Sequence, residues 1–208
     1  MRDPERRMRL GVLISGSGTN LQAIIDASVE GRLDADVAVV ISNQEDAYGL
    51  ERARKAHVPA VWIDRTAYTK FMDYNQAILD TLSQHEVDLV VMAGYMRLLG
   101  KNVLQMFPNK VVNIHPALLP SFAGASGIHD AWDYGVKVTG VTVHFANDKF
   151  DEGPIIAQEA VVVADHDTVE SLEAKIHEVE HRVYPAALQL IAEGRVEIEG
   201  RKVRIREL

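Results

Sequence analysis

"RLGVLISGSGTNLQAIIDASVEG", residues 9–31, is the stretch that decides the fold. The apolar run over 9–15 predicts a buried strand, and residues 19–31 carry apolar side chains at helical spacing until Gly31 ends the helix. Between them, "SGSGTN" (15–20) takes the chain tightly from strand to helix. A strand that passes through a glycine turn into a helix predicts the start of an α/β fold.

The same alternation of strand and helix continues to about residue 114. Further strands are predicted at 36–42, 59–63, 87–94 and 110–114, and further helices at 47–57 and 67–85. Strands built from uninterrupted Val, Ile and Leu are typical of a parallel sheet that helices cover on both faces.

The pattern changes towards the C-terminus. Residues 137–146 alternate apolar and polar side chains, and an apolar stretch at 153–163 follows. We expect a strand pair added at the sheet edge, with an antiparallel direction left open, then a helix at 168–192 and a hairpin that turns at Gly200. The predicted fold class is α/β: a single domain with an open, mostly parallel Rossmann-like sheet, helices on both faces and an added C-terminal strand pair.

Composition limits the function classes. The 208 residues are 47% hydrophobic, and 22 Lys and Arg face 30 Asp and Glu, which gives a net charge of −8. This acidic balance argues weakly against nucleic acid as a partner. The absence of cysteine excludes disulfides, thiolate zinc sites and a cysteine nucleophile. The longest apolar runs are too short to span a membrane, and we expect a soluble cytoplasmic protein.

The beginning of the chain is charged and lacks the apolar stretch of a signal peptide. We expect residues 1–7 to form a flexible leader ahead of a domain over 8–208, or the true start to be Met8.

The glycine turn after the first strand predicts a phosphate cradle. Gly16 and Gly18 bring backbone N–H groups forward, and Thr19 and Asn20 stand at the start of a helix, which favours an anion. The third glycine of a dinucleotide loop would fall on Leu21, and no lysine follows as in a Walker A loop. We therefore favour a mono-phosphate site, with an ordinary strand–helix turn as the alternative.

A second polar group ends the strand predicted at 110–114. Asn113 and His115 lie two residues apart in extended chain, so their side chains leave the same face, and Pro116 bends the chain away. An amide and an imidazole placed together can stabilise an oxyanion and move a proton. The alternative is a capping Asn and a structural His.

A carboxylate that could orient His115 is expected in "HFANDKFDEGP" (144–154). Asp148, Asp151 and Glu152 all lie there, and the sequence alone does not rank Asp148 against Asp151. An ordinary acidic surface turn would look the same.

Other catalytic signatures are missing. His177 and His181 stand four residues apart without the carboxylate motif of a zinc protease, so no metal site is predicted, and there is no GxSxG motif of a serine hydrolase.

Six stretches together resemble a known family. They are "VLISGSGTNLQAIIDA" (12–27), "SNQEDAYGLERA" (42–53), "MAGYMRLL" (92–99), "NIHPALLPSF" (113–122), "VTVHFANDKFDEGPIIAQEAV" (141–161) and "EHRVYPAALQLIAEGRV" (180–196). In this order they closely resemble the phosphoribosylglycinamide formyltransferases of the folate-dependent formyltransferase family, and the resemblance covers nearly the whole of residues 8–208.

The resemblance implies an enzyme that transfers the formyl group of 10-formyltetrahydrofolate to the amine of glycinamide ribonucleotide, in de novo purine synthesis. It implies Asn113, His115 and Asp151 as catalytic residues, and so favours Asp151 over Asp148. The folate is a cosubstrate, and no metal is implied.

The resemblance also implies the binding residues. Gly18, Thr19 and Asn20 would hold the phosphate, and Glu180 the rest of the ribonucleotide. The folate would lie against Met96, Arg97, Leu98, Leu99 and Asn113.

The chain departs from the family at two places. Many members carry an arginine where this chain has Phe71, and the adjacent Lys70 is the substitute we expect at the folate tail. In "AGASGIHDAW" (123–132), Ile128 takes the place of a family histidine and His129 follows it.

Other readings remain open at this stage. A formyltetrahydrofolate hydrolase shares the Asn-His-Asp set but usually carries an extra N-terminal domain. A methionyl-tRNA formyltransferase would need a further C-terminal domain and a basic surface. A non-catalytic nucleotide-phosphate binding module would use residues 15–20 alone. The expected partners are small molecules, without nucleic acid or membrane, and the protein is a monomer or a homodimer.

Overall fold

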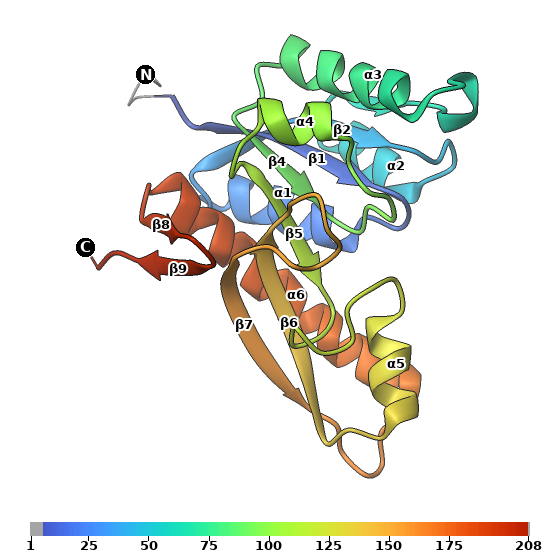
Figure 1. Ribbon diagram of the computed structural model, residues 1–208, viewed down its shortest axis with the longest axis vertical. Helices are drawn as coiled ribbons and strands as arrows, with labels where there is room; N and C mark the ends of the chain where they lie inside the picture. The colour runs from blue at the N-terminus through green and yellow to red at the C-terminus, as the bar shows by residue number, and fades with distance from the viewer. Residues whose placement is uncertain (1–5, 208) are drawn as a thin grey trace.

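The chain forms one seven-stranded sheet, seen in a computed structural model that describes residues 6–207 (Figure 1). The strand order is β3-β2-β1-β4-β5-β6-β7. The bounds are β1 Met8–Ile14, β2 Ala35–Ser42, β3 Ala60–Trp62, β4 Leu89–Met92, β5 Val111–His115, β6 Val138–Phe145 and β7 Ile155–Val162.

The first five strands are parallel, whereas β6 pairs antiparallel with both β5 and β7. The predicted sheet and its added strand pair are thereby confirmed, and the direction left open is antiparallel.

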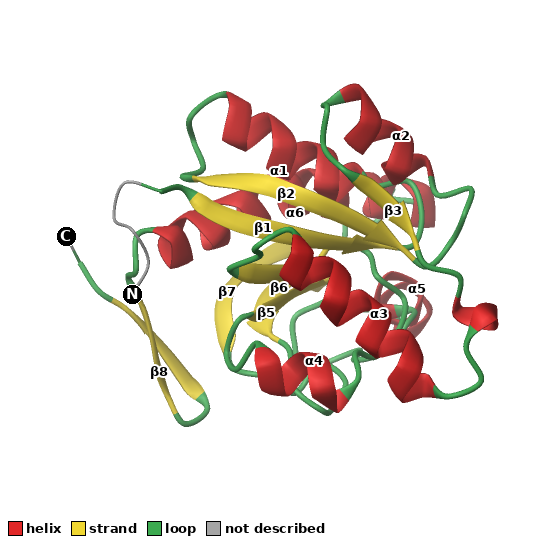
Figure 2. Cartoon of the chain, turned by 90° about the horizontal axis from the view of Figure 1, so that it is seen from above, coloured by secondary structure: helices red, strands yellow, loops and turns green. Residues whose placement is uncertain are grey.

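Helices cover both faces of the sheet, as predicted (Figure 2). On one face lie α1, α2 and α6, and on the other lie α3 and α4, while α5 packs against α6. Their bounds are α1 Thr19–Val29, α2 Tyr48–Lys55, α3 Phe71–Gln84, α4 Lys101–Met106, α5 Gly127–Tyr134 and α6 Val169–Ala192.

Some boundaries differ from the prediction. The strand expected at 87–94 is only β4, because the chain leaves the sheet after Met92 to form a loop. The helix expected from 67 starts at Phe71, after a short 3₁₀ turn over Arg65–Ala67. Sequence reasoning missed α4 and α5, because helices of six and eight residues are too short to establish a period.

Tyr184 joins α6 to the centre of the sheet. This side chain is fully buried, and its hydroxyl donates to the backbone oxygens of Met92 and Val112, each at 3.0 Å. Since these carbonyls belong to β4 and β5, one side chain of the covering helix braces the two strands that lead into the predicted site.

The last elements, β8 Val196–Glu199 and β9 Lys202–Ile205, form a separate antiparallel hairpin that turns at Gly200, as predicted (Figure 2). Most of the predicted leader, residues 1–5, lies outside the described residues. Arg7 donates to the carbonyls of Ser28 and Ala35 and so is held against the domain.

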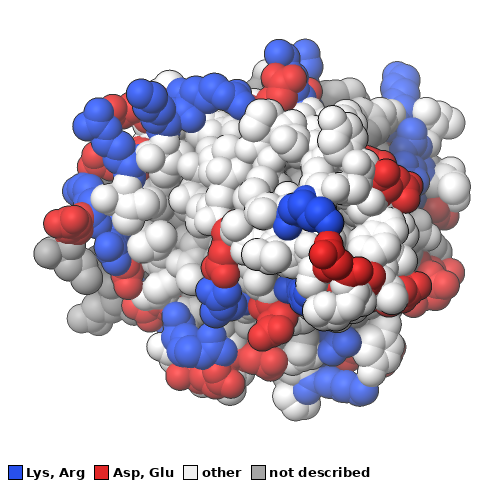
Figure 3. Space-filling model, turned by 90° about the horizontal axis from the view of Figure 1, so that it is seen from below, with Lys and Arg blue, Asp and Glu red and all other residues white. Residues whose placement is uncertain are grey.

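Charged side chains of both signs are interspersed on the face seen in Figure 3, around a largely uncharged centre. The described residues on that face thus form no continuous basic stripe of the kind that binds nucleic acid. No helix within residues 6–207 is long and apolar enough to cross a membrane.

Candidate active site

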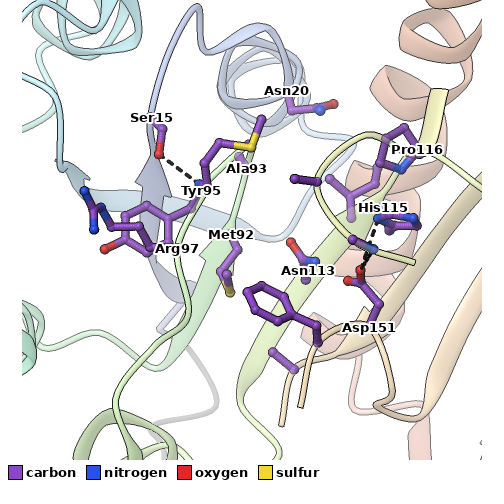
Figure 4. Close-up of a pocket in the computed structure, with 18 of the residues that line it drawn as sticks. Ser15, Asn20, Met92, Ala93, Tyr95, Arg97, Asn113, His115, Pro116 and Asp151 are labelled. Carbon is purple, nitrogen blue, oxygen red and sulfur yellow. Dashed lines mark hydrogen bonds and ion pairs between the residues drawn. The ribbon is translucent and has the colours of Figure 1, made fainter. Parts of the chain in front are cut away.

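A cavity of about 750 Å³ opens along the ends of β1, β4 and β5. Its volume suits a substrate of drug size or larger. Its lining includes the glycine loop Ser15–Asn20, the loop Met92–Leu99 and the segment Asn113–Pro116. Further lining residues come from 123–129, from 144–151 and from α6. The structure therefore brings the predicted phosphate, folate and catalytic residues to one cavity, as Figure 4 shows for the labelled members.

The glycine loop is shaped by the start of α2. Gly18 is the N-cap of α1 and has φ +70°, and a side chain on it would approach the Cα atom of Gly49 to 2.7 Å. The Gly49 N–H donates to the carbonyl of Gly16 at 3.0 Å. Arg52 donates to the carbonyl of Ser17 at 2.8 Å. The loop is thus held on the side of α2, and the start of α1 lines the cavity, where a helix N-terminus favours an anionic ligand.

Asn20 and Glu180 meet at the end of the cavity formed by the glycine loop. Asn20 Nδ2 donates to Glu180 Oε2 at 3.1 Å, and both side chains are buried. The Asn20 Oδ1 atom is buried without a partner among the described residues, so it remains available to a ligand. His177, which was not predicted as a site residue, also donates to Glu180 Oε2, at 2.8 Å from Nδ1.

Asn113, His115 and Asp151 come together as predicted. Figure 4 shows the side chains of Asn113 and His115 on the same side of β5, with Asp151 facing His115. The His115 Nδ1 atom lies 3.5 Å from Asp151 Oδ2, and both side chains are almost fully buried. Of the two aspartates left open by the sequence, Asp148 is exposed and does not line the cavity.

The path of the chain to Asp151 is unexpected. Because β6 is antiparallel, it ends beside the beginning of β5, where Phe145 pairs with Val112. The loop 146–154 then folds back over the sheet (Figure 1). Asp151 adopts φ +53°, and a side chain on Gly153 would collide with the Phe145 carbonyl at 1.6 Å. Only a glycine at 153 therefore allows this fold-back.

His115 stands between two acceptors. Its Nε2 atom lies 2.7 Å from the Phe122 carbonyl, while Nδ1 faces the Asp151 carboxylate. Only the doubly protonated imidazolium provides a donor to both acceptors. The ring is thus held between the backbone of Phe122 and the carboxylate of Asp151.

Asp151 is held as a carboxylate. Burial by itself would raise its pKa, but hydrogen bonds from His144 and the Gly124 backbone, with the nearby charges of His115 and His144, hold the pKa below its ordinary value. The Gly124 N–H donates to Oδ2 at 2.8 Å. Asp151 therefore presents an ionised carboxylate to the ring of His115.

His144 is a site residue that sequence reasoning missed. Its Nδ1 atom lies 3.0 Å from the Phe145 carbonyl, and its Nε2 atom faces both Asn113 Nδ2, at 3.3 Å, and Asp151 Oδ1, at 3.5 Å. Without a proton Nε2 accepts from the Asn113 amide, and with a proton it donates to the Asp151 carboxylate, so His144 contacts both predicted catalytic side chains but bonds to one at a time. The sequence did contain a signal for this residue: Thr142 and His144 are polar, stand two residues apart in a predicted strand and so share one face. The structure shows that both side chains are buried.

The predicted folate segment is a loop tied to the ends of β1 and β2. Met96 N–H donates to Ser15 Oγ at 2.9 Å, and Arg97 Nε lies 3.0 Å from the side-chain amide of Asn43. Neither Ser15 nor Asn43 was predicted. Met96 is 71% exposed, whereas Leu99 is buried beneath the loop, so the segment presents backbone and Met96 to the cavity.

Lys70 is not brought to the cavity. It is the exposed N-cap of α3 and does not line the cavity, and the adjacent Phe71 is also exposed. Ile128 and His129 both line the cavity, at the start of α5. Within residues 6–207 there is no group of three or more His, Asp or Glu side chains that could hold a metal ion.

Comparison with known proteins identifies the class. Residues 8–188 match the family described as formyl transferase, and the chain belongs to this family. The crystal structure of glycinamide ribonucleotide transformylase 1 from Symbiobacterium toebii is 54% identical, with a TM-score of 0.95 over 98% of this chain and 96% of that one.

Two further relatives bear on the choice of activity. Phosphoribosylglycinamide formyltransferase from Bacillus subtilis is 40% identical over 181 residues, which cover 87% of this chain and 93% of the relative. A formyltetrahydrofolate deformylase structure from Pseudomonas syringae is 28% identical, with a TM-score of 0.91. This chain covers only 68% of the deformylase chain.

Proposed function

We propose that this chain transfers the formyl group of 10-formyltetrahydrofolate to the amine of 5′-phosphoribosylglycinamide, giving the formylated ribonucleotide and tetrahydrofolate in purine biosynthesis. The observation that carries the proposal is one cavity that contains both a glycine loop at a helix N-terminus and the Asn113, His115 and Asp151 group. A hydrolase of the same cosubstrate would not need the glycine loop, because it binds no ribonucleotide phosphate.

Asn113 and His115 would stabilise the charge that develops during transfer. When the amine nitrogen attacks the formyl carbon, a C–N bond forms and the carbonyl electron pair moves to oxygen. The Asn113 amide and the imidazolium of His115 leave the same face of β5 and can both donate to that oxygen.

The proton balance assigns a role to Asp151. The attacking nitrogen must lose a proton, and the folate nitrogen must gain one as its bond to the formyl carbon breaks. Asp151 keeps His115 charged and, directly or through water, can take the first proton and allow its return to the leaving nitrogen.

The two ends of the cavity would position the substrates. Gly18, Thr19 and Asn20 would bind the phosphate, and Glu180 the ribose or the glycinamide group. Backbone of the Met96–Leu99 loop would bind the flat folate ring, with Arg97 beside it. Lys70, outside the cavity, is proposed only for the far end of the folate tail.

The test is release of tetrahydrofolate from 10-formyltetrahydrofolate, with and without the ribonucleotide. We expect release only when the ribonucleotide is present, loss of release in Asp151→Asn, and retention in Asp148→Asn, an exposed aspartate of the same loop.

Two other outcomes of this assay would contradict the proposed transferase activity. Release that ignores the ribonucleotide would indicate a hydrolase. No release under either condition would contradict both enzymes and leave a phosphate-binding module, in which His115→Ala changes only stability.

A further inference from the structure

The ribonucleotide end of the cavity contains an acidic pair that a phosphate ligand should not tolerate. Glu173 and Glu180 both line the cavity, and both lie on α6 on the side of the glycine loop. Glu180 is 3% exposed, so its charge is poorly screened by water. Without compensation, two carboxylates would repel an anionic ligand.

His177 stands between these two carboxylates. Its Nδ1 atom lies 2.8 Å from Glu180 Oε2, and its Nε2 atom lies 3.5 Å from Glu173 Oε1. The ring also lines the cavity. Both ring nitrogens therefore face carboxylates, which favours the charged form of the ring.

The same hydrogen bonds fix Glu180. Asn20 and His177 both donate to Oε2, from α1 and from α6, so the carboxylate cannot rotate freely. Among the described residues both of these bonds reach Oε2, which leaves Oε1 to meet a ligand hydroxyl or amine.

We propose that His177 is a positioning residue for the ribonucleotide: as an imidazolium it holds Glu180 in place and cancels one of the two negative charges next to the glycine loop. This inference rests on the proposed function. It makes affinity for the ribonucleotide depend on the protonation of His177.

The surroundings of His177 are consistent with this role. The hydrogen bond to Glu180, opposed in part by burial, raises the pKa of His177, and the charges of Glu180 and Glu173 raise it further. The His181 ring stacks on His177 with centroids 6.3 Å apart. Burial lowers the pKa of His181, so this neighbour is the uncharged member of the pair.

The other groups that face this pair are few. From α1 comes the uncharged Asn20 amide, and from α2 the Arg52 guanidinium, which acts on His181. The titration of His177 is therefore governed by the two glutamates.

The experiment compares ribonucleotide affinity in the wild-type chain and in His177→Gln, by calorimetry from about pH 6 to about pH 8.5. Glutamine keeps a donor for Glu180 but carries no charge. Because the ligand has its own titrating phosphate and amine, the ratio of the two affinities at each pH is the measured quantity.

At the acidic end of the pH range, we expect the wild-type chain to bind the ribonucleotide about three- to tenfold more tightly than His177→Gln, the effect of one charge close to the ligand. The ratio of the two affinities should approach one as pH rises and His177 loses its proton. In kinetics, KM for the ribonucleotide should rise, while kcat and KM for the folate stay within about twofold. His177→Ala, which loses the donor too, should bind more weakly than His177→Gln at every pH.

His166→Gln is the matched control, because His166 lies exposed in the loop before α6. It should follow the wild-type profile. A ratio that is constant across pH, with the wild-type chain binding normally, would overturn the role of His177 and leave the proposed function intact. If the wild-type chain binds no ribonucleotide, the proposed function fails and this inference fails with it.

Discussion

Gly127 offers the sharpest test of how closely His115, the proposed catalytic histidine, is held. It is the first residue of α5, and a Cβ atom added there would lie 3.1 Å from His115 Nε2, 3.2 Å from His115 Cε1 and 3.2 Å from the Phe122 carbonyl. Gly127→Ala therefore places a methyl group against the ring while leaving helical backbone geometry permissible.

The expected loss of rate follows from the steric overlap between the added methyl group and the His115 ring. Ordinary contacts between a methyl carbon and ring atoms begin at about 3.5 Å, so the ring must move by roughly 0.3–0.5 Å. A displacement of about 1 Å can cost about a hundredfold in rate, which scales to about four- to tenfold here. Stability should not fall in parallel, because replacing a helical glycine by alanine gains up to about 1 kcal/mol.

The assay pairs kcat for formyl transfer with the melting temperature. Asp133→Ala, an exposed change on the same helix, is the control and should alter neither by much. Gly127→Ser should lower kcat further than Gly127→Ala. If Gly127→Ala retained full kcat in a folded protein, the placement of His115 would not limit the reaction and the reasoning would be refuted.

Two further changes test the frame of the site. Tyr184→Phe removes the hydroxyl that bridges β4 and β5, and should cost about 1–2 kcal/mol of stability, lowering the melting temperature by about 2–8 °C. An unchanged melting curve would show that the bridge contributes nothing. Asp151 stabilises the fold through its lowered pKa, so its contribution is present above the unfolded value of 3.8 and is lost as pH falls through the folded value. Urea midpoints of the wild-type chain and Asp151→Asn should accordingly converge below about pH 4, and a gap that persists in acid would contradict this.

The sequence predicts the parallel half of the fold well because its signals are local. Strand β1, the glycine loop and α1 follow one another without interruption, and the i, i+2 spacing places Asn113 and His115 on one face. The alternation over 137–146 and the apolar stretch over 153–163 likewise predict the strands β6 and β7, but they leave the direction of the pair open.

What the sequence does not predict is set by contacts between distant segments. The role of His144 depends on the pairing of β6 with β5, which sets this ring opposite Asn113. In the sequence, His144 is one polar residue in an alternating strand. The proposed role of His177 depends in the same way on the packing of α6 beside α1, which brings Asn20 to Glu180.

The choice between Asp148 and Asp151 has the same origin. Both belong to one acidic turn, and they are distinguished by the direction in which the loop folds back, which depends on the missing side chain of Gly153. The resemblance to a family could favour Asp151, but the physical reason lies in this backbone path.

The loop 146–154, which carries Asp151, also bears on the order in which the parts of the site emerge during synthesis. The elements that carry and flank the glycine loop, β1, α1 and α2, are complete by residue 55, although Glu180, which accepts from Asn20, follows much later. His115 acquires its carboxylate only after β6 has paired with β5 and the chain has emerged beyond Asp151. The segments that carry the proposed phosphate site and the proposed reaction centre therefore emerge at different times, and both are complete only when α6 has been added.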